Sequence, residues 1–193
     1  MTKMKTMRVY FLLLCIGIQG ISHAQRVSSG SGPETPMTVG SLLINLGVGV
    51  GANYKGNNYG TGFGMKASAE WGLWEAGPGV ISLGPEIGGS FSNGSYYYGG
   101  TNYNGAKSNT FVIAGRSAWH YNWGVSSLDT YGGFSAGVGF HHYEDHSGSY
   151  DQVIPAFGAF IGGSYFVTPG FGFNAEAGFD ITNFQAGVVF KIQ

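Results

Sequence analysis

The sequence predicts an all-β fold, an eight-stranded antiparallel up-and-down transmembrane β-barrel, on three observations. The 193 residues include 36 glycines, and 16% of them are aromatic but only 10% charged, which favours repeated strands over packed helices. Eight segments alternate apolar with small or polar residues, as strands do when one side meets lipid and the other a polar lumen. Beyond residue 36, no apolar run reaches the length of a membrane-spanning helix.

The first 24 residues have the features of a secretory signal peptide. Lys3, Lys5 and Arg8 form a positive start, residues 9–18 an apolar core, and Ser22-His23-Ala24 a small-x-small cleavage site. A membrane anchor is the alternative, but the apolar run is shorter than the ~20 residues that a spanning helix needs. We therefore expect export, with a mature chain that begins at Gln25.

Removal of this segment changes the composition of the chain. The only cysteine, Cys15, leaves with it, so the mature protein has no disulfide. Six basic and ten acidic side chains remain, a net charge of −4, and no basic patch for nucleic acid is visible. Residues 25–36 are rich in Ser, Gly and Pro without periodicity, which predicts a flexible periplasmic segment. The barrel is then expected over residues 37–193.

The alternating segments follow one another along the whole predicted barrel. They cover residues 41–51, 63–73, 81–91, 110–121, 134–141, 156–167, 171–180 and 184–192. In the last of them, Val188, Phe190 and Ile192 share one face, while Gln185, Gly187 and Lys191 share the other. Because strand side chains alternate between faces, each segment predicts an outward apolar face and a polar face in the lumen.

The connections between these segments alternate in length. Residues 74–78, 123–127 and 167–170 are short, whereas residues 53–61, 92–109 and 142–152 are long and polar, and the last connection, near residues 180–183, is short. Membrane barrels have tight periplasmic turns and longer external loops. The pattern therefore predicts that both termini lie in the periplasm.

Large aromatic residues gather where the short turns are expected. They are Trp71, Trp74, Trp119, Tyr121, Trp123 and Tyr165. Tryptophan and tyrosine are enriched where a membrane protein crosses the interface between lipid and water. We expect these residues to form an aromatic girdle at the periplasmic side.

Over roughly residues 37–192 the chain resembles the small eight-stranded outer-membrane β-barrel family of Gram-negative bacteria (OmpA transmembrane domain / OmpX-like). The most specific element is the family's C-terminal assembly signal, a polar-x-Gly-x-x-aromatic-x-hydrophobic pattern. It is matched by the set Gln185, Gly187, Phe190 and Ile192, although this chain ends in Ile192-Gln193 where the family usually ends in an aromatic residue. The resemblance implies location in the cell outer membrane and recognition by the barrel-assembly machinery.

Charged residues of the polar faces predict a cluster in the lumen. They are Lys66, Glu70, Glu86, Arg116 and Glu176. A turn centred on Ala76 would place Lys66 opposite Glu86, and the Arg116 guanidinium can hold a carboxylate with two hydrogen bonds. Since eight strands enclose a space just wide enough for side chains, we expect these charges to neutralise one another and plug the lumen. The functional alternative is an ion path or a pair of catalytic carboxylates.

Two polar stretches invite a more specific role. Residues 141–146, His-His-Tyr-Glu-Asp-His, are rich in metal-ligand types, but their spacing matches no closed zinc site, so we expect a solvated loop. Residues 92–109 combine Tyr96-Tyr97-Tyr98 and Tyr103 with Gly and Asn, which suits an adaptable contact surface. His142 shares parity with outward residues, as a lipid-modifying enzyme would require, but no serine is clearly placed as its partner.

The sequence thus favours a non-enzymatic outer-membrane barrel with a structural or surface-contact role. Its expected partners are outer-membrane lipid, the barrel-assembly machinery and an external partner at residues 92–109 and 142–152. We expect no nucleic acid, cofactor, metal or catalytic residue. The alternatives are a narrow pore, a lipid A modifying outer-membrane enzyme, and a soluble secreted barrel with an apolar ligand inside, which would need its large apolar residues to point inward.

Overall fold

The computed structural model describes residues 35–54, 61–98, 101–145 and 148–192. The predicted signal peptide and most of the segment 25–36 lie outside these residues. Thr35 and Pro36, the last two residues of that segment, are buried, so the packed chain includes them. Across the described ranges, no helix is long and apolar enough to cross a membrane.

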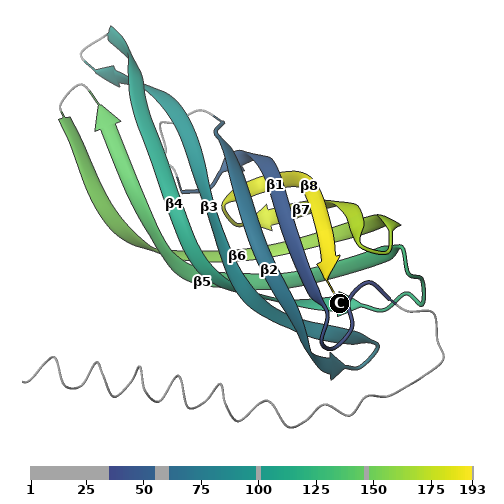
Figure 1. Cartoon of the computed structure of the whole chain (residues 1–193). Helices are drawn as coiled ribbons and strands as arrows, with labels where there is room; N and C mark the ends of the chain where they lie inside the picture. The colour runs from purple at the N-terminus through teal and green to yellow at the C-terminus, as the bar shows by residue number, and fades with distance from the viewer. Residues whose placement is uncertain (1–34, 55–60, 99–100, 146–147, 193) are drawn as a thin grey trace, which may run out of the picture. The chain divides into compact units, whose positions relative to one another are not determined.

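Eight antiparallel strands form a closed barrel in which each strand pairs with its neighbours along the chain and β8 pairs with β1 (Figure 1). The strands are β1 (Leu42–Ala52), β2 (Phe63–Ala76), β3 (Gly79–Tyr98), β4 (Thr101–Tyr121), β5 (Leu128–Asp145), β6 (Gly148–Thr168), β7 (Phe171–Phe179) and β8 (Thr182–Ile192). This arrangement confirms the predicted all-β fold class and its up-and-down order.

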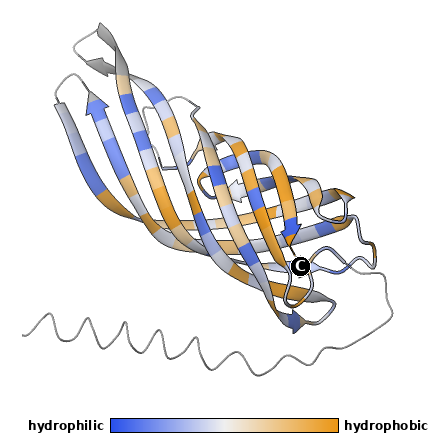
Figure 2. Ribbon diagram, in the orientation of Figure 1, coloured by the Kyte–Doolittle hydropathy of each residue, from blue (hydrophilic) through white to orange (hydrophobic). Residues whose placement is uncertain are grey.

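The wall has apolar side chains outside and polar side chains inside. Phe134, Phe157 and Ile161 are 74%, 71% and 69% exposed, although they are large and apolar. The buried set includes Lys66, Glu70, Glu86, Arg116 and Glu176. Figure 2 shows the alternation of apolar and polar residues along the strands. A soluble protein has the opposite distribution, because ionised side chains are almost never fully buried there without partners.

The turn between β2 and β3 differs from the prediction. The strands end at Ala76 and begin again at Gly79, and Gly77 has a φ of 60° in the left-handed region that favours glycine. The β2–β3 register shifts between Gly72 and Trp74. Lys66 therefore pairs with Gly88, so the predicted placement of Lys66 opposite Glu86 is wrong. The turn is centred between Gly77 and Pro78, later than Ala76, and the extra β2 residue at the bulge offsets only part of this difference.

The same bulge orients two tryptophans. Trp71 and Trp74 lie three residues apart, a spacing that would send them to opposite faces of a regular strand. Because the bulge between Gly72 and Trp74 adds a residue, both face outward, with exposures of 43% and 41%. The bulge therefore contributes to the ring of aromatic residues at this end.

We call this end the turn end, because β2–β3, β4–β5 and β6–β7 are joined there, and the opposite end the loop end. At the loop end the strands differ in length. Strands β3 to β6 have 20, 21, 18 and 21 residues, whereas β1, β2, β7 and β8 have 11, 14, 9 and 11. Strands β3–β6 thus extend beyond the rest of the wall as a four-stranded sheet, visible at the upper left of Figure 1.

This projecting sheet corrects the prediction of long loops at residues 92–109 and 142–152. Strand β3 continues to Tyr98 and β4 resumes at Thr101, while β5 continues to Asp145 and β6 resumes at Gly148. Alternation marks a strand only where its two faces differ, and it fades along residues 148–152 of β6, which are exposed on both faces. We define the projecting sheet as residues 92–98, 101–108, 141–145 and 148–152, which lie beyond the last pairs with β2 and β7.

The barrel interior also contains three small apolar clusters. One, at the turn end, is made of Met37, Leu43, Val80, Phe166 and Val189. A second contains Ala118, Tyr131 and Phe160, and the third, nearer the loop end, contains Val112, Ala114, Ala156 and Ile181 with Tyr54 packed against it. The polar interior is thus enclosed between apolar layers.

Candidate functional site

The centre of the lumen is occupied by Arg116 on β4, whose side chain is fully buried. Its Nη1 donates to Glu86 Oε2 at 3.1 Å, and its Nη2 donates to Glu176 Oε1 at 2.8 Å. Its Nε lies 2.9 Å from Glu70 Oε1, close enough for an ion pair although the geometry is not that of a hydrogen bond. One guanidinium thus contacts carboxylates from β2, β3 and β7, which its planar arrangement of donors permits.

Lys66 on β2 is the second buried cation. Its Nζ lies 2.6 Å from Glu176 Oε2, 2.5 Å from Asp180 Oδ2 and 3.4 Å from Glu86 Oε2. Glu176 therefore contacts both cations, one through each carboxylate oxygen. We call Lys66, Glu70, Glu86, Arg116, Glu176 and Asp180 the lumen ion network. The structure thus places all five sequence-predicted charges in one cluster and adds Asp180.

Hydroxyl groups and aromatic rings complete the surroundings of this network. Tyr131 donates to Glu176 Oε1 at 3.0 Å, and Ser135 donates to Asp180 Oδ1 at 3.1 Å. The Phe160 ring lies under both cations, with its centroid 3.9 Å from Arg116 Cζ and 5.4 Å from Lys66 Nζ. Such contacts add a cation–π attraction where water is excluded. The network therefore joins β2, β3, β4, β5, β6 and β7.

A second polar layer lies between the ion network and the turn end. His120 Nδ1 is 2.9 Å from Asp129 Oδ2, and His120 Nε2 is 3.1 Å from Ser82 Oγ. These distances match those of a catalytic Ser-His-Asp arrangement. However, Ser82 is fully buried, and its hydroxyl donates to Glu70 Oε2 at 2.7 Å. A nucleophile must be accessible to its substrate, and Ser82 is not. The hydrogen bonds of this layer instead connect strands β2, β3, β4 and β5.

Sequence reasoning missed Asp180, His120, Asp129 and Ser82 as members of one interior system. The available signal was parity, because Ser82, His120 and Asp180 occur on the polar faces of their segments. Parity predicts which face a residue takes, but it does not predict which residues on different strands meet. Those pairs depend on the register around the closed ring.

The predicted girdle residues lie on the outer face at the turn end. Trp71, Trp74, Trp119, Trp123 and Tyr165 are 39% to 59% exposed, and Tyr121 is partly exposed. Trp119 Nε1 donates to the Ala76 carbonyl at 3.0 Å, and Trp123 Nε1 donates to Thr130 Oγ1 at 2.8 Å. The Tyr121 ring packs between Trp119 and Trp123 with centroid distances of 5.6 and 4.6 Å. The Trp119 and Trp123 indoles thus each have an apolar body outside and a satisfied N–H.

The residues of the predicted C-terminal signal divide between the two faces of β8. Gln185 is buried in the interior, whereas Phe190 and Ile192 are 38% and 49% exposed on the outside. Gly187 pairs with Gly47 on β1 and with Asn174 on β7. The strand that carries the pattern is therefore the one that closes the ring.

The two adjacent histidines of the histidine-rich stretch point to opposite faces of β5, because side chains alternate along a strand. His141 Nδ1 lies 2.8 Å from Thr110 Oγ1, whereas His142 Nδ1 lies 2.6 Å from Asp151 Oδ1. A hollow of about 270 Å³ is lined by both histidines and by Phe140, Asp151, Gln152 and Val153. His146 lies outside the described residues. Among the residues that the structure describes, no three His, Cys, Asp or Glu side chains are grouped as metal ligands would be.

Of the comparisons with known proteins, only the one with solved structures gives matches. No protein-family model matches the chain, and no curated protein matches it. Among solved structures, it is similar to the crystal structure of Ail, the attachment invasion locus protein of Yersinia pestis, at 12% identity and a TM-score of 0.43. A second structure of Ail, in complex with the heparin analogue sucrose octasulfate, gives 14% identity and a TM-score of 0.42. Each match covers 80% of this chain and 100% of the other.

The fold assignment therefore rests on the chain's own strand pairing, which is continuous around the ring. The assignment of a role rests on its own residues as well: an apolar outer wall, a charge-filled interior and a projecting polar sheet.

Proposed function

We infer that this chain is an integral outer-membrane barrel without catalytic activity, and that its projecting sheet contacts an external partner. The membrane location is supported by the polarity of the wall, which is the opposite of that in a soluble protein. Large apolar side chains such as Phe134 and Phe157 are exposed around the barrel while Arg116 and Glu86 are fully buried. Lipid is the solvent that makes such a surface stable.

The orientation follows from the two ends. Trp119 and Trp123, whose N–H groups are hydrogen-bonded, lie at the turn end. The first strand of the barrel begins at this end and the last strand finishes there. In outer-membrane barrels the short turns and the termini face the periplasm. The projecting sheet is then outside the cell, and the exported chain reaches the membrane by way of the predicted signal peptide and the assembly machinery.

The contact role is supported by the two edge strands of the projecting sheet, which pair with one neighbouring strand only among the residues that the structure describes. Residues 148–158 of β6 pair with β5 on one side, and pairing with β7 begins only at Ala159. Residues 92–98 of β3 likewise extend beyond the last pair with β2, at Phe91. A strand edge presents backbone N–H and C=O groups that an extended polypeptide can pair with. We therefore favour an extended protein segment as the external partner.

Membrane embedding is tested by extraction. The barrel should remain in the membrane fraction through carbonate and high salt and dissolve only in detergent, because its wall is apolar. A protein that dissolves in buffer without detergent contradicts the proposal and supports a soluble barrel.

The contact role is tested with a shortened β5–β6 hairpin. Replacement of residues 143–150 by Asn-Gly keeps His142 opposite Asp151, and this dipeptide favours a tight hairpin turn. Cells that display the native barrel should bind a reduced and alkylated polypeptide that cannot fold, and cells with the shortened hairpin should bind less. Equal binding by both contradicts the role of this edge.

The interior also bears on the two alternative functions. The lumen ion network and the apolar layers on either side of it support a plugged barrel rather than a pore. Planar-bilayer recording should therefore show no steady conductance. Mass spectrometry of lipid A from cells with and without the protein should show no change, whereas a changed acyl pattern would support an enzyme.

A further inference from the structure

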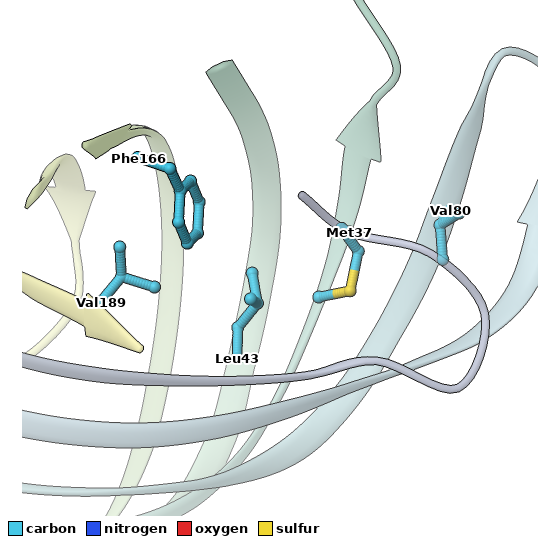
Figure 3. Packing of buried hydrophobic residues seen from close by; sticks show 5 residues of the cluster. All are labelled: Met37, Leu43, Val80, Phe166 and Val189. Carbon is cyan, nitrogen blue, oxygen red and sulfur yellow. The ribbon is translucent and has the colours of Figure 1, made fainter. Parts of the chain in front are cut away.

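The barrel mouth at the turn end is covered by the chain's own N-terminal segment, residues 35–40. Met37 is only 3% exposed and lies within an apolar cup formed by Leu43, Val80, Phe166 and Val189. Figure 3 shows the Met37 side chain directed into this cup, between Leu43 and Val80. These five residues form the apolar cluster at this end of the interior.

The chain turns back into the mouth at Gly40. This glycine has a φ of 91°, a backbone conformation that residues with a side chain rarely adopt. Its N–H donates to the Gly72 carbonyl at 2.8 Å, and the Gly72 N–H donates to the Ser41 carbonyl at 2.9 Å. The β1–β2 pairing thus continues just beyond Leu42 and ends at Gly40, where the covering segment begins.

Beyond Gly40 the segment is held by a local turn and by side-chain packing. The Thr38 N–H donates to Ser41 Oγ at 2.9 Å, and the Thr38 carbonyl accepts from the Ser41 hydroxyl and N–H at 2.7 and 3.1 Å. The Thr35 carbonyl accepts a long hydrogen bond of 3.5 Å from Lys191 Nζ, and Met37 Sδ lies 3.3 Å from the hydroxyl of Ser41, the residue that follows the segment. Val39 and Gly40, at the rim, are exposed. Met37 is the residue of the segment that belongs to the apolar cluster, and Thr35 and Pro36 are buried beside it in the chain.

Gly72 is shaped to admit this segment. A Cβ atom at Gly72 would collide with the Thr38 carbonyl oxygen and would lie 3.1 Å from Met37 Sδ. The interior face of β2 thus leaves room at one position for the covering chain. The glycine belongs to the bulge that also turns Trp71 and Trp74 outward.

The cup borders the His120 layer. Val80 pairs with His120 across β3 and β4, and His120 contacts Asp129. With the segment withdrawn, the cup would open toward these two buried polar side chains. The remaining barriers to the loop end would be the lumen ion network and the apolar cluster of Val112, Ala114, Ala156 and Ile181.

We propose that residues 35–40 form a hinged inner lid, which opens and closes the periplasmic mouth by withdrawing or inserting Met37 while the barrel stays folded. The periplasmic location of this mouth rests on the proposed membrane orientation, but the existence of the lid does not. In its open state the lid admits water as far as the His120–Asp129 pair and stops short of a through channel.

The test uses a thiol reporter in the cup. The mature chain, begun at Gln25, contains no cysteine, so Val80→Cys introduces a single thiol of nearly conserved size. Refolded protein in detergent is treated with a charged, water-soluble thiol reagent, and the labelling rate is compared with the rate of global unfolding under the same conditions. Heat-modifiable gel mobility confirms that each variant is folded.

Two variants should open the lid by different means. Met37→Asp places a charge in the cup, and Gly72→Ala removes the space for Thr38, so each should raise the labelling rate of the Val80→Cys thiol by about tenfold or more through local opening. Met37→Leu, which keeps the apolar volume, should leave the rate near that of the native lid.

The native lid should label faster than the barrel unfolds, because opening is local. A native labelling rate equal to the unfolding rate would mean that residues 35–40 are a fixed part of the core, and it overturns the proposal. Rapid labelling that neither variant changes would mean that the segment does not cover the mouth. Both results can be read in detergent, so they are independent of the membrane location and of any external partner.

Discussion

The barrel wall and the projecting sheet are built from the same strands, β3 to β6, but they meet different surroundings. Within the wall, one face of each strand is apolar and exposed, and the other is polar or charged and buried. Phe111 and Arg116 are examples from the two faces of β4. In the projecting sheet, the polar pair Lys107 and Glu144 lies across β4 and β5, with side chains 55% and 49% exposed. Strand pairing continues from the wall into the projecting sheet, with one shift of the β3–β4 register between Gly94 and Ser95, while the surroundings of the side chains differ.

The comparison explains which parts of the fold can be predicted from sequence. Where the two faces of a strand differ, a slip by one residue would bury apolar groups with charges and expose charges to lipid, so alternation is strict and legible. Where both faces meet water, as along residues 148–152 of β6, no such constraint acts, and the sequence resembles that of a loop. The same physical difference predicts unequal energetic consequences for mutations in the two regions.

The largest effect is expected at Arg116. Replacement by Ala leaves Glu70, Glu86 and Glu176 buried without their shared cation, which should lower the free energy of unfolding by about 3 to 5 kcal/mol. Urea unfolding in detergent, with the heat-modifiable gel shift, measures it. Arg116→Lys keeps the charge but loses the planar donors and should cost less. An unchanged midpoint with altered conductance would show that the network serves ion passage instead.

The next effect concerns the lipid-facing wall. Arg at Ala67, Ala136 or Ala175 should cost roughly 2 to 4 kcal/mol each if the site lies near the bilayer midplane, because each position faces outward. Unfolding in lipid vesicles is the suitable measurement. Ser149→Arg in the projecting sheet is the matched control and should be nearly neutral. A similar penalty at both positions would contradict the boundary drawn between wall and sheet.

A smaller effect is expected for the aromatic girdle. Trp119→Phe keeps a ring at the turn end but removes the hydrogen bond from the indole N–H to the Ala76 carbonyl. The loss should be about 1 kcal/mol in vesicles, the net value of an ordinary hydrogen bond. Trp123→Phe, which removes the bond to Thr130, should behave alike. Stabilisation by either change would argue against an interfacial role for these indoles.

The smallest effect is expected in the projecting sheet. Lys107→Ala removes an exposed ion pair whose atoms are 3.4 Å apart, and the loss should be about 0.5 kcal/mol or less. Salt should reduce even this difference, because exposed charges are screened. The unfolding midpoint at low and high salt provides the measurement. A loss as large as that for Arg116 would mean that the projecting sheet helps to hold the barrel together.

The sequence predicted which charged residues face the interior, but it did not predict which of them are in contact. Lys66, Glu86 and Arg116 could be assigned to the lumen because each has the parity of the polar face. The partners of Lys66 could not, since the bulge at Gly72 shifts the β2–β3 register and Asp180 lies just after β7. Met37 and Ile181 were also missed, because each is a lone apolar residue outside the alternating segments that becomes buried only once the ring has closed.

The pairing of Leu42 with Ile192 has a further consequence for how the polypeptide is ordered. The beginning and the end of the barrel lie side by side, so the gap between β8 and β1 is geometrically equivalent to any of the tight connections around the ring. A chain rearranged to begin at Phe171 and to continue from β8 through a short linker into β1 would retain every strand neighbour. The identity of the first strand is thus a matter of genetic order, and the closed circle itself has no first strand.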